Sequence, residues 1–251
     1  MQHSLTDEIL ALKRDRKAII LAHHYQDSEI QEIADAIGDS LELSLKARQF
    51  DGDVIAFCGV KFMAETAKVL NPSRTVILPD LEAGCSLVDA CPAEQVRAYK
   101  SRHPEQKVVS YINTSVEVKA ESDILCTSRN AVKVVNSIAA EQPILFLPDV
   151  NLGNYVQKQS GRTNMTIWQG ACIVHATFAE RKLMAAQAAH PNAVVVAHPE
   201  CPPAVLARST YIGSTSALID WCVASDAQEF IVMTESGVLH SLSRRAPNKI
   251  F

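Results

Sequence analysis

The chain of 251 residues is 47% hydrophobic and 21% charged, with a formal net charge of -4 at pH 7. This composition predicts a soluble globular protein with a substantial core, and the negative charge excludes the basic field on which nucleic-acid binding depends. We find no signal-peptide pattern and no apolar run long enough to cross a bilayer. We therefore expect a cytoplasmic protein with no membrane partner.

Short apolar, β-branched runs alternate with amphipathic stretches of helical length along the chain. This alternation predicts an α/β fold, with parallel sheets covered by helices. The predicted strands, in chain order, are residues 17–22, 53–58, 75–78, 107–112, 143–147, 165–168, 193–197 and 229–233.

One structural unit occurs three times in this series. A strand that runs into polar residues, at 19–25, 108–114 and 195–200, is followed each time by a hydroxyl-bearing helix start, at 38–40, 126–130 and 213–216. Such a repeat indicates related domains, which we place at 1–88, 89–176 and 177–251. We expect three small parallel-sheet α/β domains related by pseudo-threefold symmetry around a central active site, with the third domain incomplete.

Glycine-containing turns after the third strand of the first two units hold Cys85 and Cys172, which are 87 residues apart. The same interval predicts a third cysteine at about position 259, beyond Phe251. Residues 249–251 resemble the start of the strand that would precede it. We therefore expect that the chain is truncated before its third cysteine.

Polar side chains stand at the ends of the predicted strands. In parallel α/β proteins, ligands gather at the carboxyl ends of strands and at the amino ends of the helices that follow. His23, Tyr111 and His198 hold equivalent positions, which favours a shared pocket over three separate structural roles. A histidine there can bind a carboxylate or transfer a proton, and a glutamate can accept one. Further groups at the same level are Tyr25, Asn113 and Glu200.

Hydroxyl side chains mark the three helix starts. Each of Ser40, Ser128 and Thr215 could simply cap its helix. Their matching repeat positions favour three anion receptors for a phosphate or carboxylate instead.

In the expected cytoplasmic location, the seven cysteines would be kept reduced. Their odd number and lack of CxxC spacing argue against both a disulfide scaffold and a zinc ribbon. Cys58 and Cys126 each end an apolar run and are interpreted as core residues. Cys85 and Cys172 follow equivalent turns and are candidate iron–sulfur ligands. Cys201 is kept as an alternative ligand.

An ordered series of motifs along essentially the whole chain resembles the quinolinate synthase family. The segments that carry the resemblance are residues 22–26, 38–40, 57–67, 84–86, 111–114, 126–131, 147–149, 168–172, 198–201 and 213–216. Each segment alone is weak evidence for the family, but the whole series in this order is highly specific for it.

The resemblance implies three α/β domains around a pseudo-threefold axis and a [4Fe–4S] cluster with one cysteine from each domain, of which Cys85 and Cys172 are two. It also implies condensation of iminoaspartate with dihydroxyacetone phosphate in NAD biosynthesis, coupled to L-aspartate oxidase. Tyr25, Glu200 and His23 are then expected to be catalytic. The substrate pocket is implied to consist of His23, Ser40, Tyr111, Asn113, Ser128, His198, Glu200 and Thr215.

Two alternatives remain open from the sequence. The chain could be a cluster-deficient module that binds a dicarboxylate or phosphate, or a zinc- or cysteine-dependent hydrolase of an anionic substrate. A colourless, metal-free protein that still binds a dicarboxylate would favour the binding module. Bound zinc, or rapid inactivation through one alkylated cysteine, would favour the hydrolase.

Overall fold

A computed structural model describes residues 4–251, so residues 1–3 of the N-terminal segment lie outside the described part. The chain forms two compact units, unit 1 (Met1–Gly84) and unit 2 (Cys85–Phe251). Each unit is described by itself. No helix among the described residues is both long and apolar enough to cross a membrane.

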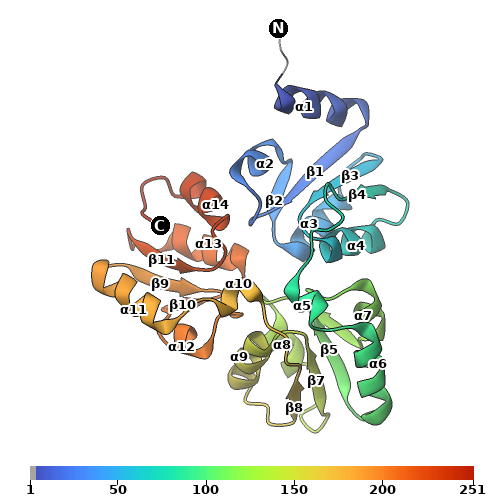
Figure 1. Cartoon of the computed structure of the whole chain (residues 1–251), viewed down its shortest axis with the longest axis vertical. Coiled ribbons are helices and arrows are strands. Elements are labelled where there is room, and N and C mark those ends of the chain that lie inside the picture. The colour runs from blue at the N-terminus through green and yellow to red at the C-terminus, as the bar shows by residue number, and fades with distance from the viewer. Residues whose placement is uncertain (1–3) are drawn as a thin grey trace. The chain divides into compact units, whose positions relative to one another are not determined.

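Unit 1 is built on one parallel sheet of four strands in the order β2-β1-β3-β4. In Figure 1 this sheet and its helices are blue to teal. The elements are α1 (Leu5–Asp15), β1 (Ala18–His23), α2 (Ser28–Ile33), β2 (Ala36–Gly38), α3 (Ser40–Ala47), β3 (Val54–Cys58), α4 (Lys61–Leu70) and β4 (Thr75–Ile77).

The first half of unit 2 repeats this plan with a parallel sheet in the order β6-β5-β7-β8. It is green to olive in Figure 1. The elements are α5 (Ser86–Asp89), α6 (Ala93–Arg102), β5 (Lys107–Tyr111), α7 (Val116–Glu121), β6 (Ile124–Cys126), α8 (Ala131–Asn136), β7 (Ile144–Leu147), α9 (Val150–Ser160) and β8 (Met165–Ile167).

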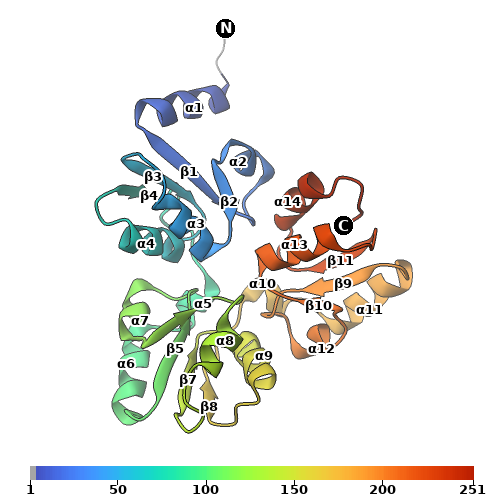
Figure 2. The same cartoon turned by 180° about the vertical axis from the view of Figure 1, so that it is seen from behind.

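The second half of unit 2 has a third parallel sheet in the order β10-β9-β11, which Figure 2 shows from behind in orange to red. The elements are α10 (Ile173–Ala176), α11 (Glu180–Ala189), β9 (Val194–Ala197), α12 (Pro203–Leu206), β10 (Tyr211–Ile212), α13 (Thr215–Ala224), β11 (Phe230–Met233) and α14 (Val238–Arg245).

The three sheets share a connectivity that creates a ligand position. In each, the chain passes from the central strand (β1, β5 or β9) to a neighbour on one side and then to β3, β7 or β11 on the other. Since parallel crossovers are right-handed, this reversal places the connecting helices on opposite faces. Ligands of such sheets bind where the direction reverses, at the carboxyl end of the central strand.

The apolar content of the inner strands of each sheet explains their burial. Every residue of β7 is buried, as are five of the six residues of β1, because helices cover both faces of a parallel sheet.

In two of the sheets, an aspartate just before the short neighbouring strand is hydrogen-bonded to the central strand. Asp35 accepts a hydrogen bond from the backbone N–H of Ile20 at 2.8 Å, and Asp123 accepts one from Val108 at 2.7 Å.

All eight predicted strands are confirmed, with bounds that differ by one residue or less at each end. The short strands β2, β6 and β10 were not predicted. In the third sheet, Ile250 forms a parallel bridge with Glu229 beside β11, the position that β4 and β8 hold in the other sheets. The prediction of a strand start at 249–251 agrees with this bridge.

The prediction of an α/β fold with three small parallel sheets is confirmed. The domain boundaries at 88/89 and 176/177 stay predictions. The placement of the sheets around a pseudo-threefold axis also stays a prediction.

Candidate active site

The carboxyl ends of β5 and β9 carry buried polar groups in unit 2. β5 ends at Tyr111, and β9 ends immediately before His198 and Glu200. These three side chains are only 6%, 3% and 2% exposed. Ionisable groups are rarely buried this deeply without a partner. These three side chains also lie at the carboxyl ends of strands, where ligands of parallel sheets bind.

The carboxylate of Glu200 is surrounded by hydrogen-bonding side chains. Its Oε2 lies 3.0 Å from Nδ1 of His175 and its Oε1 lies 3.8 Å from Nδ1 of His198. The side chain of Tyr111 also hydrogen-bonds to it. Burial acts to raise the pKa of Glu200, but the nearby imidazole of His198 and the hydrogen bonds from His175 and Tyr111 outweigh it and lower the pKa below its usual value. Glu200 is therefore ionised at neutral pH.

The local backbone defines the tautomer of His198. The backbone N–H of Glu200 donates to Nδ1 of His198 at 3.3 Å, so the neutral ring carries its proton on Nε2. Burial lowers the pKa of His198 to about 4, an effect that the charge of Glu200 opposes and nearby His175 reinforces. At neutral pH His198 is a hydrogen-bond donor without a charge.

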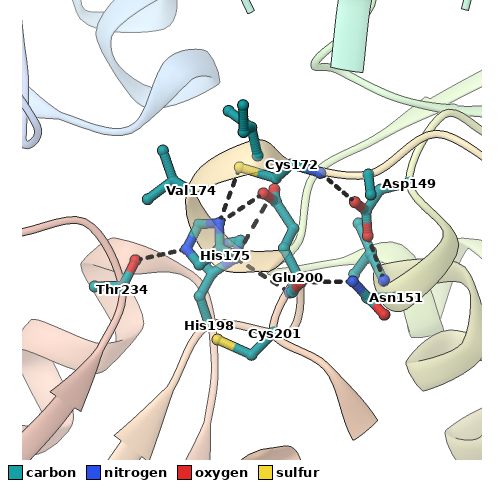
Figure 3. A network of polar contacts seen from close by, with 12 residues as sticks. Asp149, Asn151, Cys172, Val174, His175, His198, Glu200, Cys201 and Thr234 are labelled. Carbon is teal, nitrogen blue, oxygen red and sulfur yellow. Dashed lines mark hydrogen bonds and ion pairs between the residues drawn. The ribbon is translucent and has the colours of Figure 1, made fainter. Parts of the chain in front are cut away.

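His175 joins a thiol, a carboxylate and a hydroxyl. It lies on the short helix α10, three residues after Cys172. Its Nδ1 lies 3.1 Å from Sγ of Cys172 and 3.0 Å from Glu200, and its Nε2 lies 2.9 Å from Oγ1 of Thr234, just after β11. Figure 3 shows these side chains pointing toward one another. The ligand atoms of Cys172, His175 and Glu200 all lie within 4.8 Å of one another, and this group could hold a metal ion.

A close backbone approach shapes the turn before Cys172. Gly170 pairs with Asp149 in a parallel bridge, and a Cβ at Gly170 would lie 2.6 Å from the carbonyl oxygen of Pro148, so any larger residue requires the backbone to shift. Asp149 accepts a hydrogen bond from the N–H of Cys172 at 3.2 Å. Burial and the charge of Glu200 raise the pKa of Asp149 to about 8, although backbone N–H groups oppose this shift.

The turn of Cys85 is hydrogen-bonded to the turn of Cys172. The hydroxyl of Ser86 donates to the carbonyl oxygen of Ala171 at 3.2 Å and accepts from the N–H of Ile173 at 3.0 Å. One side chain thus connects residues that flank both cysteines, across 85 and 87 positions of the chain.

The negative charge of Glu200 acts on the thiols of both Cys85 and Cys172. Cys85 and Cys172 are half-buried, and neither forms a disulfide bond. Burial raises both pKa values, that of Cys85 to about 11, and the negative charge of Glu200 raises them further. Without a bound cation, both side chains are therefore thiols and not thiolates at neutral pH.

Three further cysteines that the sequence analysis singled out have different surroundings. Cys126 is buried, as its assignment to the core predicts, whereas Cys58 is only half-buried. Cys201 packs in an apolar cluster and its thiol donates to the carbonyl oxygen of Met233 at 3.2 Å. This arrangement favours a packing role over the alternative role as a ligand.

The three predicted anion-binding hydroxyls are not helix caps. Ser40 and Thr215 are the first residues of α3 and α13, and Ser128 lies in the turn before α8. The N-cap residues of the three helices are Asp39, Ser214 and Asn130. The capping interpretation of Ser40, Ser128 and Thr215 was therefore wrong, and their role as anion receptors stays a prediction.

Asn113 has an unusual amide. It follows β5 by two positions, and its buried Oδ1 has no hydrogen-bond partner among the described residues. Such a buried acceptor in a folded protein calls for an explanation, and a bound ligand is one.

His23, Tyr25 and Ser40 lie in unit 1, and their predicted place in a pocket shared with unit 2 stays a prediction. The local geometry at the end of β1 nevertheless matches that at β9. The N–H of Tyr25 donates to Nδ1 of His23 at 3.2 Å, and the two rings meet edge to face with centroids 4.5 Å apart. His23, when neutral, therefore carries its proton on Nε2, as His198 does.

Sequence reasoning missed three residues of this site, His175, Asp149 and Thr234. The spacing of Cys172 and His175, one helical turn apart, was the only local signal for the histidine. Asp149 lay within a segment that carried the family resemblance but was given no role. Thr234 had no signal, because its contact with His175 joins positions 59 residues apart.

The fold and the site define a class of protein: a parallel α/β protein with a buried cluster of acid, histidine and thiol groups that could hold a metal. The family model described as "Quinolinate synthetase A protein" matches residues 7–251. The chain belongs to the quinolinate synthase family.

Similar curated proteins agree with this assignment. A quinolinate synthase from Nostoc sp. (strain PCC 7120) is 56% identical over 97% of this chain and 75% of its own length. Those of Trichodesmium erythraeum and Chloroherpeton thalassium are 54% and 53% identical, over 98% and 100% of this chain and 76% and 77% of their own lengths. The two alternatives left open by the sequence are not favoured.

One solved structure, the E-1-hydroxy-2-methyl-but-2-enyl-4-diphosphate reductase from Plasmodium falciparum, covers 98% of this chain and 84% of its own with a TM-score of 0.32 and 11% identity. A likeness of that size supports no conclusion about fold or function.

Proposed function

We propose that this protein condenses iminoaspartate with dihydroxyacetone phosphate to quinolinate, with loss of phosphate and water, in de novo NAD biosynthesis. The observation that carries the proposal is the meeting of Glu200 with His198 and Tyr111 at the carboxyl ends of β9 and β5. Ring formation requires carbon–carbon bond formation, imine formation and dehydration. These steps need groups that accept and return protons, and they involve no net oxidation or reduction.

Glu200 is the proposed general base and acid of unit 2. It is ionised, buried and hydrogen-bonded by His175 and Tyr111, so it can accept a substrate proton and return it at a later step. The hydrogen bond from Tyr111 fixes its orientation. Tyr25, with His23 beside it, supplies the second proton-transfer group that the family resemblance implies.

The pocket also offers neutral hydrogen-bond donors for anions. His198 carries its proton on Nε2, which suits a substrate carboxylate, and His23 has the same local geometry. The unpaired Oδ1 of Asn113 is an acceptor for an N–H or O–H of the substrate. Both proposed substrates are anions with such groups.

Hydroxyl groups complete the proposed substrate site. Ser40 and Thr215 are the first residues of α3 and α13, and Ser128 lies in the turn that leads into α8. Backbone N–H groups and the helix dipole at such helix starts favour a phosphate or carboxylate. None of the three is the N-cap residue of its helix.

We assign Cys85 and Cys172 as two protein ligands of a [4Fe–4S] cluster. Their surroundings fit such a group: the turns are tied together through Ser86, both thiols are half-buried, and the charge of Glu200 opposes thiolates that lack a cation. When bound, a cluster with an iron that is not ligated by protein supplies a Lewis acid that polarises a substrate oxygen or nitrogen.

The proposal includes a partner reaction and a location. Iminoaspartate would come from an enzyme that oxidises aspartate, which the resemblance identifies as L-aspartate oxidase. A cytoplasmic location would keep the two ligand thiols reduced and available.

The test is product formation by the anaerobically purified and iron–sulfur reconstituted protein. We expect quinolinate from dihydroxyacetone phosphate when L-aspartate oxidase and aspartate supply iminoaspartate, detected by chromatography and mass. Glu200→Gln is the control, since it keeps the shape of the side chain but removes the charge. Absence of quinolinate from a protein with full iron and sulfide content would reject the proposed reaction.

A further inference from the structure

Cys172, His175 and Glu200 present three different ligand atoms to one point. Nδ1 of His175 lies 3.1 Å from Sγ of Cys172 and 3.0 Å from Oε2 of Glu200, and all three atoms lie within 4.8 Å of one another. Zinc binds such atoms at about 2.0–2.3 Å, which in a tetrahedron separates neighbouring ligands by about 3.3–3.8 Å. The observed spacing thus approaches that of three ligands around one ion.

The local sequence and burial support the same geometry. Cys172 is the N-cap of α10, and His175 lies three residues later on the same face of that turn. Glu200 enters from the end of β9. His175 and Glu200 are each 2% exposed, so their side chains have little freedom to move away from the point where they meet.

Outer hydrogen bonds hold each ligand in place. Nε2 of His175 contacts the hydroxyl of Thr234 at 2.9 Å, and the N–H of Cys172 donates to Asp149 at 3.2 Å. The backbone carbonyl of Glu200 accepts from Asn151 at 3.1 Å. Figure 3 shows these contacts around the three ligands. Metal-binding side chains are characteristically oriented by a second set of hydrogen bonds of this kind.

We propose that Cys172, His175 and Glu200 form a site for a single divalent transition-metal ion, with Zn(II) the preferred ion. One sulfur, one imidazole nitrogen and one carboxylate oxygen are the ligand types that zinc takes, and they leave a fourth position for water or a small anion. This site differs from the proposed cluster, because it uses His175 and Glu200 and does not use Cys85.

The two sites share Cys172, so they exclude each other. Where the proposed function holds, zinc at the single-ion site removes one sulfur ligand and the carboxylate of Glu200 at the same time. Zinc would then block cluster assembly in protein that has lost its cluster.

The experiment uses the full chain, stripped of metal and kept reduced under anaerobic conditions. Co(II) is the probe, because a thiolate ligand gives it a sulfur-to-metal charge-transfer absorption. We expect one Co(II) per chain with the signal of a single thiolate, and displacement by one equivalent of Zn(II). His175→Asn is expected to bind Co(II) at least tenfold more weakly, and Thr234→Val about tenfold more weakly.

Cys85→Ser is the matched control. It removes a proposed cluster ligand and is expected to bind Co(II) like the unmodified chain, whereas His175→Asn is expected to keep its capacity for iron and sulfide. If His175→Asn does not fold, as judged by circular dichroism, Glu200→Gln takes its place in the cobalt titration. Unchanged Co(II) affinity in the variant used, or loss of the signal in Cys85→Ser, would overturn the single-ion site.

The outcomes separate this inference from the proposed function. Co(II) binding that depends on His175, in a protein that never forms quinolinate, supports the single-ion site and rejects only the reaction. Quinolinate formation by a protein that binds no Co(II) in its cluster-free form supports the proposed reaction and rejects the single-ion site. Prior addition of Zn(II) is expected to prevent iron–sulfur assembly in the unmodified chain, and an unaffected rate of assembly would contradict competition.

Discussion

The backbone N–H of Glu200 donates to Nδ1 of His198, and two residues after β1 the N–H of Tyr25 donates to Nδ1 of His23 in the same way. The two sites lie in different units and have different side chains at the donating position. A shared backbone geometry thus sets one tautomer for both histidines, with the proton on Nε2 of the neutral ring.

This relationship predicts the nitrogen chemical shifts of both rings. In protein labelled with ¹⁵N-histidine, His23 and His198 are expected to show a protonated Nε2 and an unprotonated Nδ1 at neutral pH. Assignment would use His23→Gln and His198→Gln, each of which removes one set of signals. A protonated Nδ1 at either residue would contradict the hydrogen bond from the backbone.

Removal of a proposed cluster ligand should abolish cluster assembly. Cys85→Ser and Cys172→Ser are each expected to lose the bound iron and sulfide, because serine oxygen is a poor substitute for a thiolate in such a cluster. The measurements are iron and sulfide analysis and visible absorption after anaerobic reconstitution. Cys58→Ala is the control, with a cost limited to packing. Full iron content in both serine variants would reject the assignment.

Neutralising Glu200 should separate cluster assembly from turnover. We expect Glu200→Gln to keep its iron and sulfide and to form quinolinate about 10²–10⁴-fold more slowly, because a positioned acid–base group contributes a factor of that size. The rate of product formation at saturating substrate is the quantity to measure. A near-normal rate would remove Glu200 from the proton transfers.

The hydroxyl of Ser86 should stabilise unit 2. Ser86→Ala removes hydrogen bonds to the residues on either side of Cys172, and each such bond contributes about 0.5–1.5 kcal/mol. We expect Ser86→Ala to have a lower midpoint in urea unfolding. In a separate anaerobic reconstitution, we expect the variant to assemble the cluster more slowly. Ser101→Ala, on the exposed side of α6, is the control with little effect. Equal midpoints for the two variants would show that the hydroxyl does not hold the turns together.

Two glycines near the cysteines should respond differently to a methyl group. Gly170→Ala places a Cβ 2.6 Å from the carbonyl oxygen of Pro148, so the backbone must shift, at a cost of about 1–3 kcal/mol. Gly84→Ala brings its Cβ no closer than 3.7 Å to the oxygen of Glu82 and is expected to change stability by less than about 0.5 kcal/mol. Thermal unfolding of both variants provides the comparison, and equal stability would show that the approach at Gly170 can relax.

The sequence predicted eight of the eleven strands among the described residues but not β2, β6 and β10. Residues 144–147 form a continuous apolar run, and this composition predicts a strand that is buried on both faces. β10 has only two residues, Tyr211 and Ile212, and its pairing depends on β9 and not on its own pattern. Local sequence carries too little information for a strand of that length.

The candidate site was only partly predictable for a similar reason. Tyr111, His198 and Glu200 could be predicted because each follows an apolar strand that is visible in the sequence. His175 could not, because its role depends on contacts with Glu200 and Thr234, which are distant in the chain and come together only through tertiary packing.

The hydrogen bonds of Ser86 to Ala171 and Ile173 also bear on when the protein could acquire the proposed cluster. They close a loop that contains the whole β5–β8 sheet, so the turns of Cys85 and Cys172 are joined by contacts between residues that are far apart in the unfolded chain. Iron uptake during biogenesis would then follow folding, and the amount of iron bound per chain would serve as a direct measure of how many molecules have completed this half of unit 2.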